Sequence, residues 1–282
     1  MAVRDAWELV IDGPPEAERS VLLLPGGANA ARSFDLVMAD EALAGVRLVA
    51  TTLPGMAGAP LSPDASIPGL ARRAGELAKE HACDVVVGFS FGATVALEMV
   101  LSGHFRGPVV LLGISLTTAD ESRLFRSVVQ VSRRVGSWPT AGLLRLMPLM
   151  ARSAKVPAEH RKELIEDLKQ NRAGDTVRVC GEYLDYIAAG RDFAAELAAS
   201  GNRVWVVHAE KGDGGLTAAE RATLQAASTV SLVTIPGAVF LLPDEAPRQT
   251  AAVIAGALEA VTCSHRAGAR TTVRGARPST ST

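Results

Sequence analysis

Short apolar runs alternate with helical patterns through the first half of the chain, and this alternation restricts the possible folds more than any other feature. The runs are rich in valine, isoleucine and leucine, and they are continuous rather than alternating with polar residues. Such runs are typical of strands buried on both faces, as in a parallel sheet covered by helices. The order strand, helix, strand therefore predicts a doubly wound α/β fold. The expected strands span residues 7–11, 21–26, 46–55, 84–90, 108–115, 203–210 and 229–237.

The middle of the chain, residues 118–190, contains no strand-like run. Helical patterns follow one another there, and an all-helical insert in an α/β chain indicates a lid over a site. A last helix is expected over residues 247–261. The end of the chain is basic and rich in serine, threonine and arginine, which predicts disorder. The expected organisation is a core of residues 1–117 and 191–262, a helical cap of 118–190 and a disordered tail of 263–282.

Composition narrows the functional class. The 282 residues are 48% hydrophobic, which is enough for a large buried core. A net charge of −1 gives no electrostatic reason to expect nucleic acid or an anionic membrane. No apolar run reaches the roughly 18 residues of a membrane span, and the first residues lack the apolar core of a signal peptide. The cysteines are far apart and odd in number, which favours a reducing, cytoplasmic setting: Cys83, Cys180 and Cys263.

One short motif indicates a catalytic residue. Residues 88–92 read Gly-Phe-Ser-Phe-Gly, with Ser90 at the centre. A buried strand leads into this G-x-S-x-G pattern and a helix rich in small residues follows it, which is the setting of a nucleophile elbow. The flanking glycines are needed because side chains there would collide with the neighbouring elements. The alternative is an ordinary glycine-lined turn in which the serine caps the helix.

With this motif in place, residues 7–260 resemble the α/β-hydrolase superfamily. The resemblance implies a mostly parallel, doubly wound sheet with a helical cap inserted after the sixth strand. It also implies an oxyanion hole formed by the backbone N–H groups of Gly27 and Phe91, which would stabilise negative charge on a substrate oxygen. The acid of the family matches Asp213, with Glu210 as a weaker candidate. Each of these residues could instead belong to an ordinary turn.

The catalytic histidine of that family has no counterpart at its usual place. Relatives commonly read P-G-A-G-H-F after the last strand, whereas residues 236–240 here read P-G-A-V-F, with Val239 and Phe240 at the end. Histidine is also common in relatives where this chain has Phe89 and Met56. These apolar replacements indicate either drift after loss of activity or a dry pocket for a hydrophobic substrate.

Another histidine could replace the missing base. His208 ends a strand close to Asp213, and His160 lies in the expected lid. His81 and His104 precede strands, so we expect them at the opposite edge of the sheet. His265 lies in the expected tail.

Three functions stay open at this stage. A serine hydroxyl is a poor nucleophile unless a base takes its proton. The sequence therefore favours a non-hydrolytic enzyme that performs cyclisation, rearrangement, elimination or proton transfer on a small apolar carbonyl compound, with Ser90 and Asp213 in a degenerate triad. The alternatives are a serine ester or thioester hydrolase with a relocated histidine and an inactive ligand-binding protein. We see no dinucleotide fingerprint and no metal-ligand cluster, so no cofactor is expected.

Overall fold

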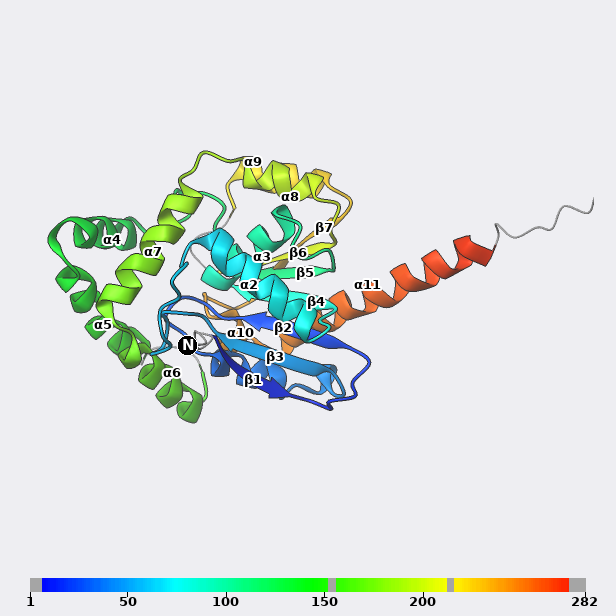
Figure 1. The fold of residues 1–282 in the computed structure, drawn as a ribbon, viewed down its shortest axis with the longest axis horizontal. Coiled ribbons are helices and arrows are strands. Elements are labelled where there is room, and N and C mark those ends of the chain that lie inside the picture. Colours follow the sequence, from blue (N-terminus) through cyan, green and yellow to red (C-terminus); the bar gives the residue numbers. More distant parts are fainter. Residues whose placement is uncertain (1–6, 152–155, 212–215, 274–282) are drawn as a thin grey trace, which may run out of the picture.

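A computed structural model describes residues 7–151, 156–211 and 216–273 of the chain. Seven strands form one sheet in the order β1-β3-β2-β4-β5-β6-β7 (Figure 1). β1 pairs with β3 in the antiparallel direction, and every other neighbouring pair is parallel. The predicted α/β-hydrolase fold is confirmed. The strands are β1 (Glu8–Asp12), β2 (Ser20–Leu24), β3 (Arg47–Thr52), β4 (Val85–Phe89), β5 (Val109–Leu112), β6 (Val204–Ala209) and β7 (Val230–Ile235).

The sheet separates two apolar cores. In β2, Leu22 and Leu24 point into one core, and Val21 and Leu23 point into the other. All four are fully buried, which explains why the strand is apolar throughout rather than alternating. The helices of the sheet layers are η1 (Ala31–Phe34), α1 (Asp35–Met38), η2 (Glu41–Leu43), α2 (Ile67–Glu80), α3 (Phe91–Leu101), α8 (Phe193–Ala199), α9 (Ala218–Ala226), α10 (Leu242–Glu245) and α11 (Pro247–Val273).

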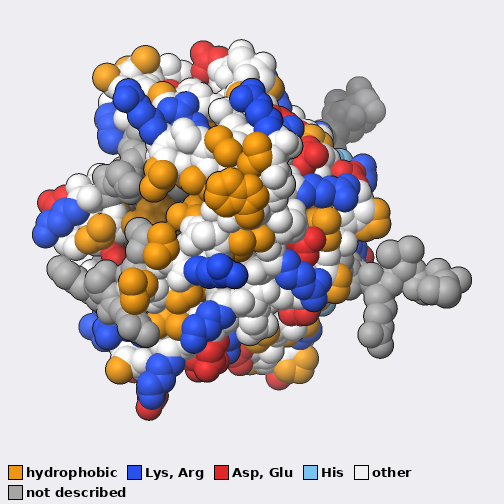
Figure 2. Space-filling view, turned by 90° about the vertical axis from the view of Figure 1, so that its left-hand side faces the viewer, with side chains coloured by type: hydrophobic (Ala, Val, Ile, Leu, Met, Phe, Trp, Pro, Cys, Tyr) orange, Lys and Arg blue, Asp and Glu red, His pale blue; other side chains and the backbone are white. Residues whose placement is uncertain are grey.

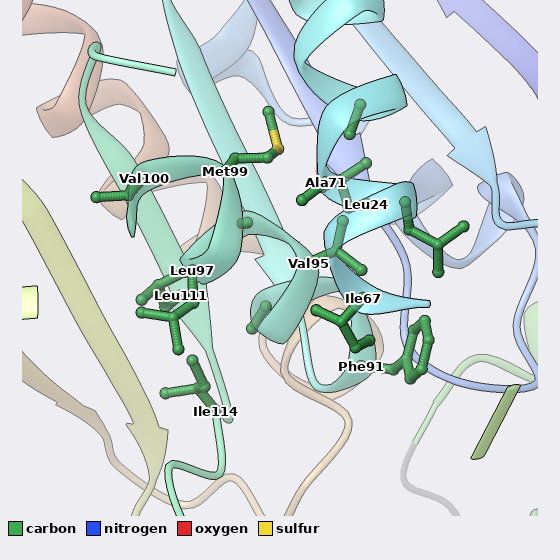
Figure 3. Packing of buried hydrophobic residues seen from close by; sticks show 14 of the residues in the cluster. Leu24, Ile67, Ala71, Phe91, Val95, Leu97, Met99, Val100, Leu111 and Ile114 are labelled. Atoms are coloured by element: carbon green, nitrogen blue, oxygen red, sulfur yellow. The ribbon is translucent and has the colours of Figure 1, made fainter. Parts of the chain in front are cut away.

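Helix α3 is the centre of one core. Figure 3 shows its side chains between α2 and the sheet, with Val95 beside Ile67 of α2 and Leu97 beside Leu111 of β5. This helix is apolar around most of its circumference because it packs against the sheet on one side and against α2 and α8 on others.

Four helices lie between β5 and β6 and form the lid: α4 (Arg123–Val135), α5 (Trp138–Ala151), α6 (Ala158–Gln170) and α7 (Ala173–Ile187). The lid follows the fifth described strand rather than a sixth. Helix α11 continues to Val273, past the end expected at Val261, so the predicted tail begins with helical residues. No helix of the described residues is long and apolar enough to cross a membrane.

The outer surface of the lid combines apolar and basic side chains. Figure 2 shows hydrophobic side chains gathered on this face with lysine and arginine around them. The described stretch 122–151 carries arginines but no acidic residue. Its large exposed apolar side chains lie on α4 and α5: Leu124, Val131, Val135, Trp138, Leu146 and Leu149.

Two glycines let α3 start directly after β4. A Cβ atom on Gly92 would lie 2.2 Å from the backbone oxygen of Leu24, and one on Gly88 would lie 2.3 Å from the oxygen of Gly92. Both contacts involve backbone atoms, which cannot rotate away as a side chain can. The sheet and α3 therefore approach each other as closely as glycine allows.

We predict that Gly92→Ala lowers the free energy of unfolding by about 3 kcal/mol or more, because the new methyl group must displace the end of β2. Gly142→Ala in α5 is the matched control, since nothing lies within 4 Å of its added Cβ. That change should be neutral or stabilise by roughly 0.5–1 kcal/mol through helix propensity. Urea unfolding followed by circular dichroism measures both. Equal effects of the two substitutions would contradict the close-packing argument.

Candidate active site

Ser90 stands at the turn between β4 and α3 in a strained backbone conformation. Its φ is +49° and its ψ is −114°, a left-handed region that residues with side chains rarely occupy. The Ser90 N–H donates to the carbonyl of Leu112 at 2.8 Å, which fixes the turn against β5. The hydroxyl has no hydrogen-bond partner among the described residues. The turn thus presents an unpartnered hydroxyl at the carboxyl edge of the sheet, as in a nucleophile elbow.

Ser90 opens into a cavity of about 290 Å³ between the sheet and the lid. Gly27 and Phe91, whose backbone N–H groups would form the oxyanion hole according to the family resemblance, line the same cavity. Among the described residues, neither N–H donates a hydrogen bond. Two unused donors beside an unpartnered hydroxyl suit a substrate carbonyl oxygen. The full lining is Gly27, Ala28, Ser90, Phe91, Glu121, Phe125, Val129, Thr140, Leu143, Leu144, Met147, Thr176, Cys180, Tyr183 and Phe240.

A larger hollow of about 570 Å³ lies between α5 and α6. Its lining includes Leu144 and Asn171 but neither Ser90 nor the two amides. We place the chemistry in the smaller cavity, because volume without a reactive group does not define an active site.

The loop that carries Gly27 is held from both sides. Ala28 has a left-handed backbone, with φ +66°, and its N–H donates to the sulfur of Met56 at 3.2 Å. The side chain of Asn171 donates to the Ala28 carbonyl at 2.9 Å and accepts from the Ala57 N–H at 2.9 Å. One lid residue therefore ties together the loops after β2 and β3. Sequence reasoning missed Asn171, because an asparagine just after a helix looks like an ordinary helix end.

Of the four predicted pocket residues, only Phe240 lines the cavity. Val239 is 40% exposed and is absent from the lining. Phe89 and Met56 are buried behind the wall instead. The Phe89 ring lies 5.7 Å from the Phe240 ring, and its edge would be 2.9 Å from a Cβ on Gly26. Phe89 and Met56 thus support the loop after β2 rather than contact the cavity.

Of the two candidate acids, Asp213 lies outside the described residues, so its role stays a prediction. Glu210 is exposed, and its carboxylate accepts from the Gly237 N–H at 2.8 Å, which ties β6 to the turn after β7.

His160 forms a buried ion pair that joins the lid to the core. Its Nε2 lies 2.6 Å from the carboxylate of Asp244 on α10, and its Nδ1 lies 3.4 Å from that of Glu163. The hydrogen bond to Asp244 raises the pKa of His160, and the negative charges of Glu163 and Asp35 act in the same direction. Because carboxylates face both ring nitrogens and favour the protonated ring, this histidine is poorly suited to take a proton from Ser90.

A second ionic contact fixes α6 beside the first. The guanidinium of Arg32 on η1 binds Asp167 through two nitrogens, with Nε 2.8 and 2.9 Å from the two carboxylate oxygens. The Asp167 side chain is only 4% exposed. Buried pairs of this kind cost much free energy when one partner is removed. The lid is therefore anchored to the core through α6.

His208 is the histidine whose chemistry best suits a base. It is buried at the end of β6, and its Nε2 has no partner among the described residues. Burial lowers its pKa, and the positive charge of Arg221 lowers it further, so the ring is neutral at pH 7. It does not line the cavity, and among the described residues no histidine does.

The strand register relates His208 to Ser90. Phe89 pairs with Leu112, which pairs with Val207. The next residues, Ser90 and His208, therefore lie at the same level of the sheet, two strands apart, or about 10 Å between their backbones. Gly113 stands between them without a side chain.

Comparison with known proteins now identifies the family. The model of the alpha/beta hydrolase family matches residues 21–259. The chain belongs to this family. A search of curated proteins finds no match.

Solved structures with the same fold include two esterases and a thioesterase domain. An esterase from Thermogutta terrifontis is 17% identical, with 90% of this chain and 93% of that one covered and a TM-score of 0.70. A putative aryl esterase from Burkholderia cenocepacia is 12% identical, with 91% and 95% covered and a TM-score of 0.71. A thioesterase domain from the curacin biosynthetic pathway is 16% identical, with 88% and 94% covered and a TM-score of 0.60. At these identities the likeness shows the fold alone.

We predict that the His160–Asp244 pair makes stability depend on pH. The pKa of His160 is raised in the folded protein. The ion pair therefore contributes fully to the free energy of unfolding below the pKa of the unfolded state, about 6.5, and this contribution is lost as pH rises through the pKa of the folded state. His160→Gln should therefore cost the most near pH 6, roughly 3 kcal/mol, and less at pH 9. Melting temperatures across this range measure the difference.

The control is Arg133→Gln, which breaks the exposed pair with Asp185. Its cost should be small over the same range, because exposed ion pairs contribute little to stability. A His160→Gln effect that is equally large at pH 6 and pH 9 would show that the ring acts through packing alone.

Proposed function

We propose that the protein hydrolyses an ester or thioester with an apolar acyl or alcohol part, with Ser90 as the nucleophile. The observation that carries this proposal is the unpartnered Ser90 hydroxyl in one cavity with the unused N–H groups of Gly27 and Phe91. Acyl transfer needs a nucleophile and a site for the oxyanion within reach of the same carbonyl. Membership of the family and the similarity in fold to an esterase and a thioesterase domain support the same reaction class.

In this proposal His208 is the base. Its lowered pKa keeps the ring neutral, and its unpartnered Nε2 has no competing contact. The separation from Ser90 requires a side-chain shift or a bridging water when substrate binds. Catalytic hydrogen bonds are often long in the free enzyme and tighten in the complex. His160 is the weaker choice, since both its nitrogens face carboxylates.

A non-hydrolytic reaction is the second candidate, and the lining of the cavity favours it. Phe240, from the loop where relatives carry histidine, faces the Ser90 cavity with an apolar ring. Cyclisation, rearrangement, elimination or proton transfer at a carbonyl compound would use Ser90 and the two amides as hydrogen-bond donors. Holding a flexible substrate in a reactive shape can itself lower a barrier by several kcal/mol.

We predict that a fluorophosphonate labels wild-type Ser90 and that Ser90→Ala abolishes both labelling and hydrolysis of p-nitrophenyl hexanoate. Intact-mass spectrometry measures the adduct, and absorbance measures turnover. Ser102→Ala is the control, because Ser102 ends α3 and its hydroxyl binds the Glu98 carbonyl. Absence of labelling and of ester turnover would exclude the hydrolase. Tight ligand binding without turnover would then indicate a ligand-binding protein.

We predict that His208→Asn lowers kcat for the ester by about a hundredfold or more, because the base is removed, while His160→Gln leaves kcat within a few fold. The wild-type rate should fall only below pH 6.5, since burial lowers the pKa of His208. Stopped-flow assays across pH 4.5–8 measure both effects. An unchanged acid limb in His208→Asn would assign the base to another group.

A further inference from the structure

One carboxylate faces the Ser90 cavity and is locked in place by the core and the lid. The Oε1 atom of Glu121 accepts hydrogen bonds from the Ser115 hydroxyl at 2.7 Å and from the Tyr183 hydroxyl at 2.5 Å. Ser115 follows β5 in the core, and Tyr183 belongs to α7 of the lid. Both donors are buried. The carboxylate therefore has one fixed position in the cavity wall.

The other oxygen of this carboxylate is unused. No described residue donates a hydrogen bond to Oε2 of Glu121, and this atom is not sealed from solvent. No lysine, arginine or histidine lines the cavity to balance the negative charge. The other polar side chains of the lining belong to Ser90, Thr140, Thr176, Cys180 and Tyr183.

The Glu121 carboxylate raises the pKa values of two neighbouring groups. Burial raises the pKa of Cys180 to about 12, and the charge of Glu121 adds to that shift. Burial and Glu121 likewise raise the pKa of Tyr183, so its hydroxyl stays protonated and continues to donate. The apolar cavity thus contains one uncompensated negative group with an open acceptor.

We propose that this carboxylate is a recognition site for an ammonium group on the substrate, so that the molecule binds by its carbonyl at the Gly27 and Phe91 amides and by its amine at Glu121. This inference rests on the proposed function in taking the Ser90 cavity as the substrate site. A charge in an apolar cavity is costly unless it is paired, and a primary ammonium supplies both the opposite charge and N–H donors. A carboxylate ligand of the same shape would be repelled. The preferred substrate class is therefore an amino-substituted ester, thioester or related carbonyl compound, which should bind more tightly than a simple fatty acyl compound.

Binding is tested without turnover, using three six-carbon probes at pH 7: hexylammonium, 1-hexanol and hexanoate. In wild-type protein, calorimetry should give hexylammonium an affinity at least about tenfold higher than that of hexanoate. Glu121→Gln should remove this preference. Glu182→Gln is the matched control, because it removes an exposed carboxylate of α7 that does not line the cavity, so the preference should persist. Equal affinities of the two charged probes in the wild type would overturn the proposal.

The location is tested in wild-type protein by methyl NMR of labelled methionine, so the result does not depend on a variant that folds. Met147 lines the cavity and Met38 lies in the core on the other side of the sheet. Hexylammonium should shift the Met147 methyl signal and leave that of Met38 unchanged. A preference with Met147 unshifted would place the binding elsewhere and overturn the proposal. Ester turnover without an ammonium preference would refute this inference alone, and the preference without any turnover would refute hydrolysis alone.

Discussion

The close contact between α3 and the end of β2 is the constraint on which the site depends. Without side chains on Gly88 and Gly92, the first turn of α3 reaches the backbone of Leu24. That approach brings the Phe91 N–H beside the loop that carries Gly27, so the helix and the loop share one cavity. It also forces Ser90 into its left-handed conformation. One packing contact thus has two results: the backbone of Ser90 is strained, and the N–H groups of Gly27 and Phe91 lie in the same cavity.

The lid has two parts with different relations to the core. Helix α6 is attached by ionic and polar contacts through His160, Asp167 and Asn171. Helices α4 and α5 carry exposed apolar side chains outside and cavity-lining ones inside. Because regions with fewer buried contacts open more easily, we expect the cavity to open at α4 and α5 rather than at α6. The anchoring of α6 also keeps Asn171 on the loop that positions Gly27.

The fold could be predicted from the sequence because local patterns determine it: buried runs gave the strands, and G-x-S-x-G in its strand and helix context gave the turn at Ser90. The cavity was harder to predict, because its wall depends on which lid residues face inward. Met56 and Phe89 were expected in the pocket, yet they lie behind its wall. A residue that is close to a site residue in the sequence does not have to face the site. Glu121 was missed because its place in the cavity wall depends on a hydrogen bond from Tyr183, which is 62 positions away in the chain. The roles of Asp213 and of a replacement base stay predictions.

The cavity combines donors from the core with walls from the lid, and this division has an energetic consequence. Hydrogen bonds to a developing oxyanion are far stronger where water is excluded, because the local dielectric is low. The N–H groups of Gly27 and Phe91 belong to the core, whereas Val129, Leu143 and Met147 of α4 and α5 supply apolar walls of the same cavity. These apolar walls also strengthen the field of Glu121 on any charge in the cavity. A loosened lid would therefore weaken the oxyanion contacts and the recognition of charge together, even with every core residue unchanged.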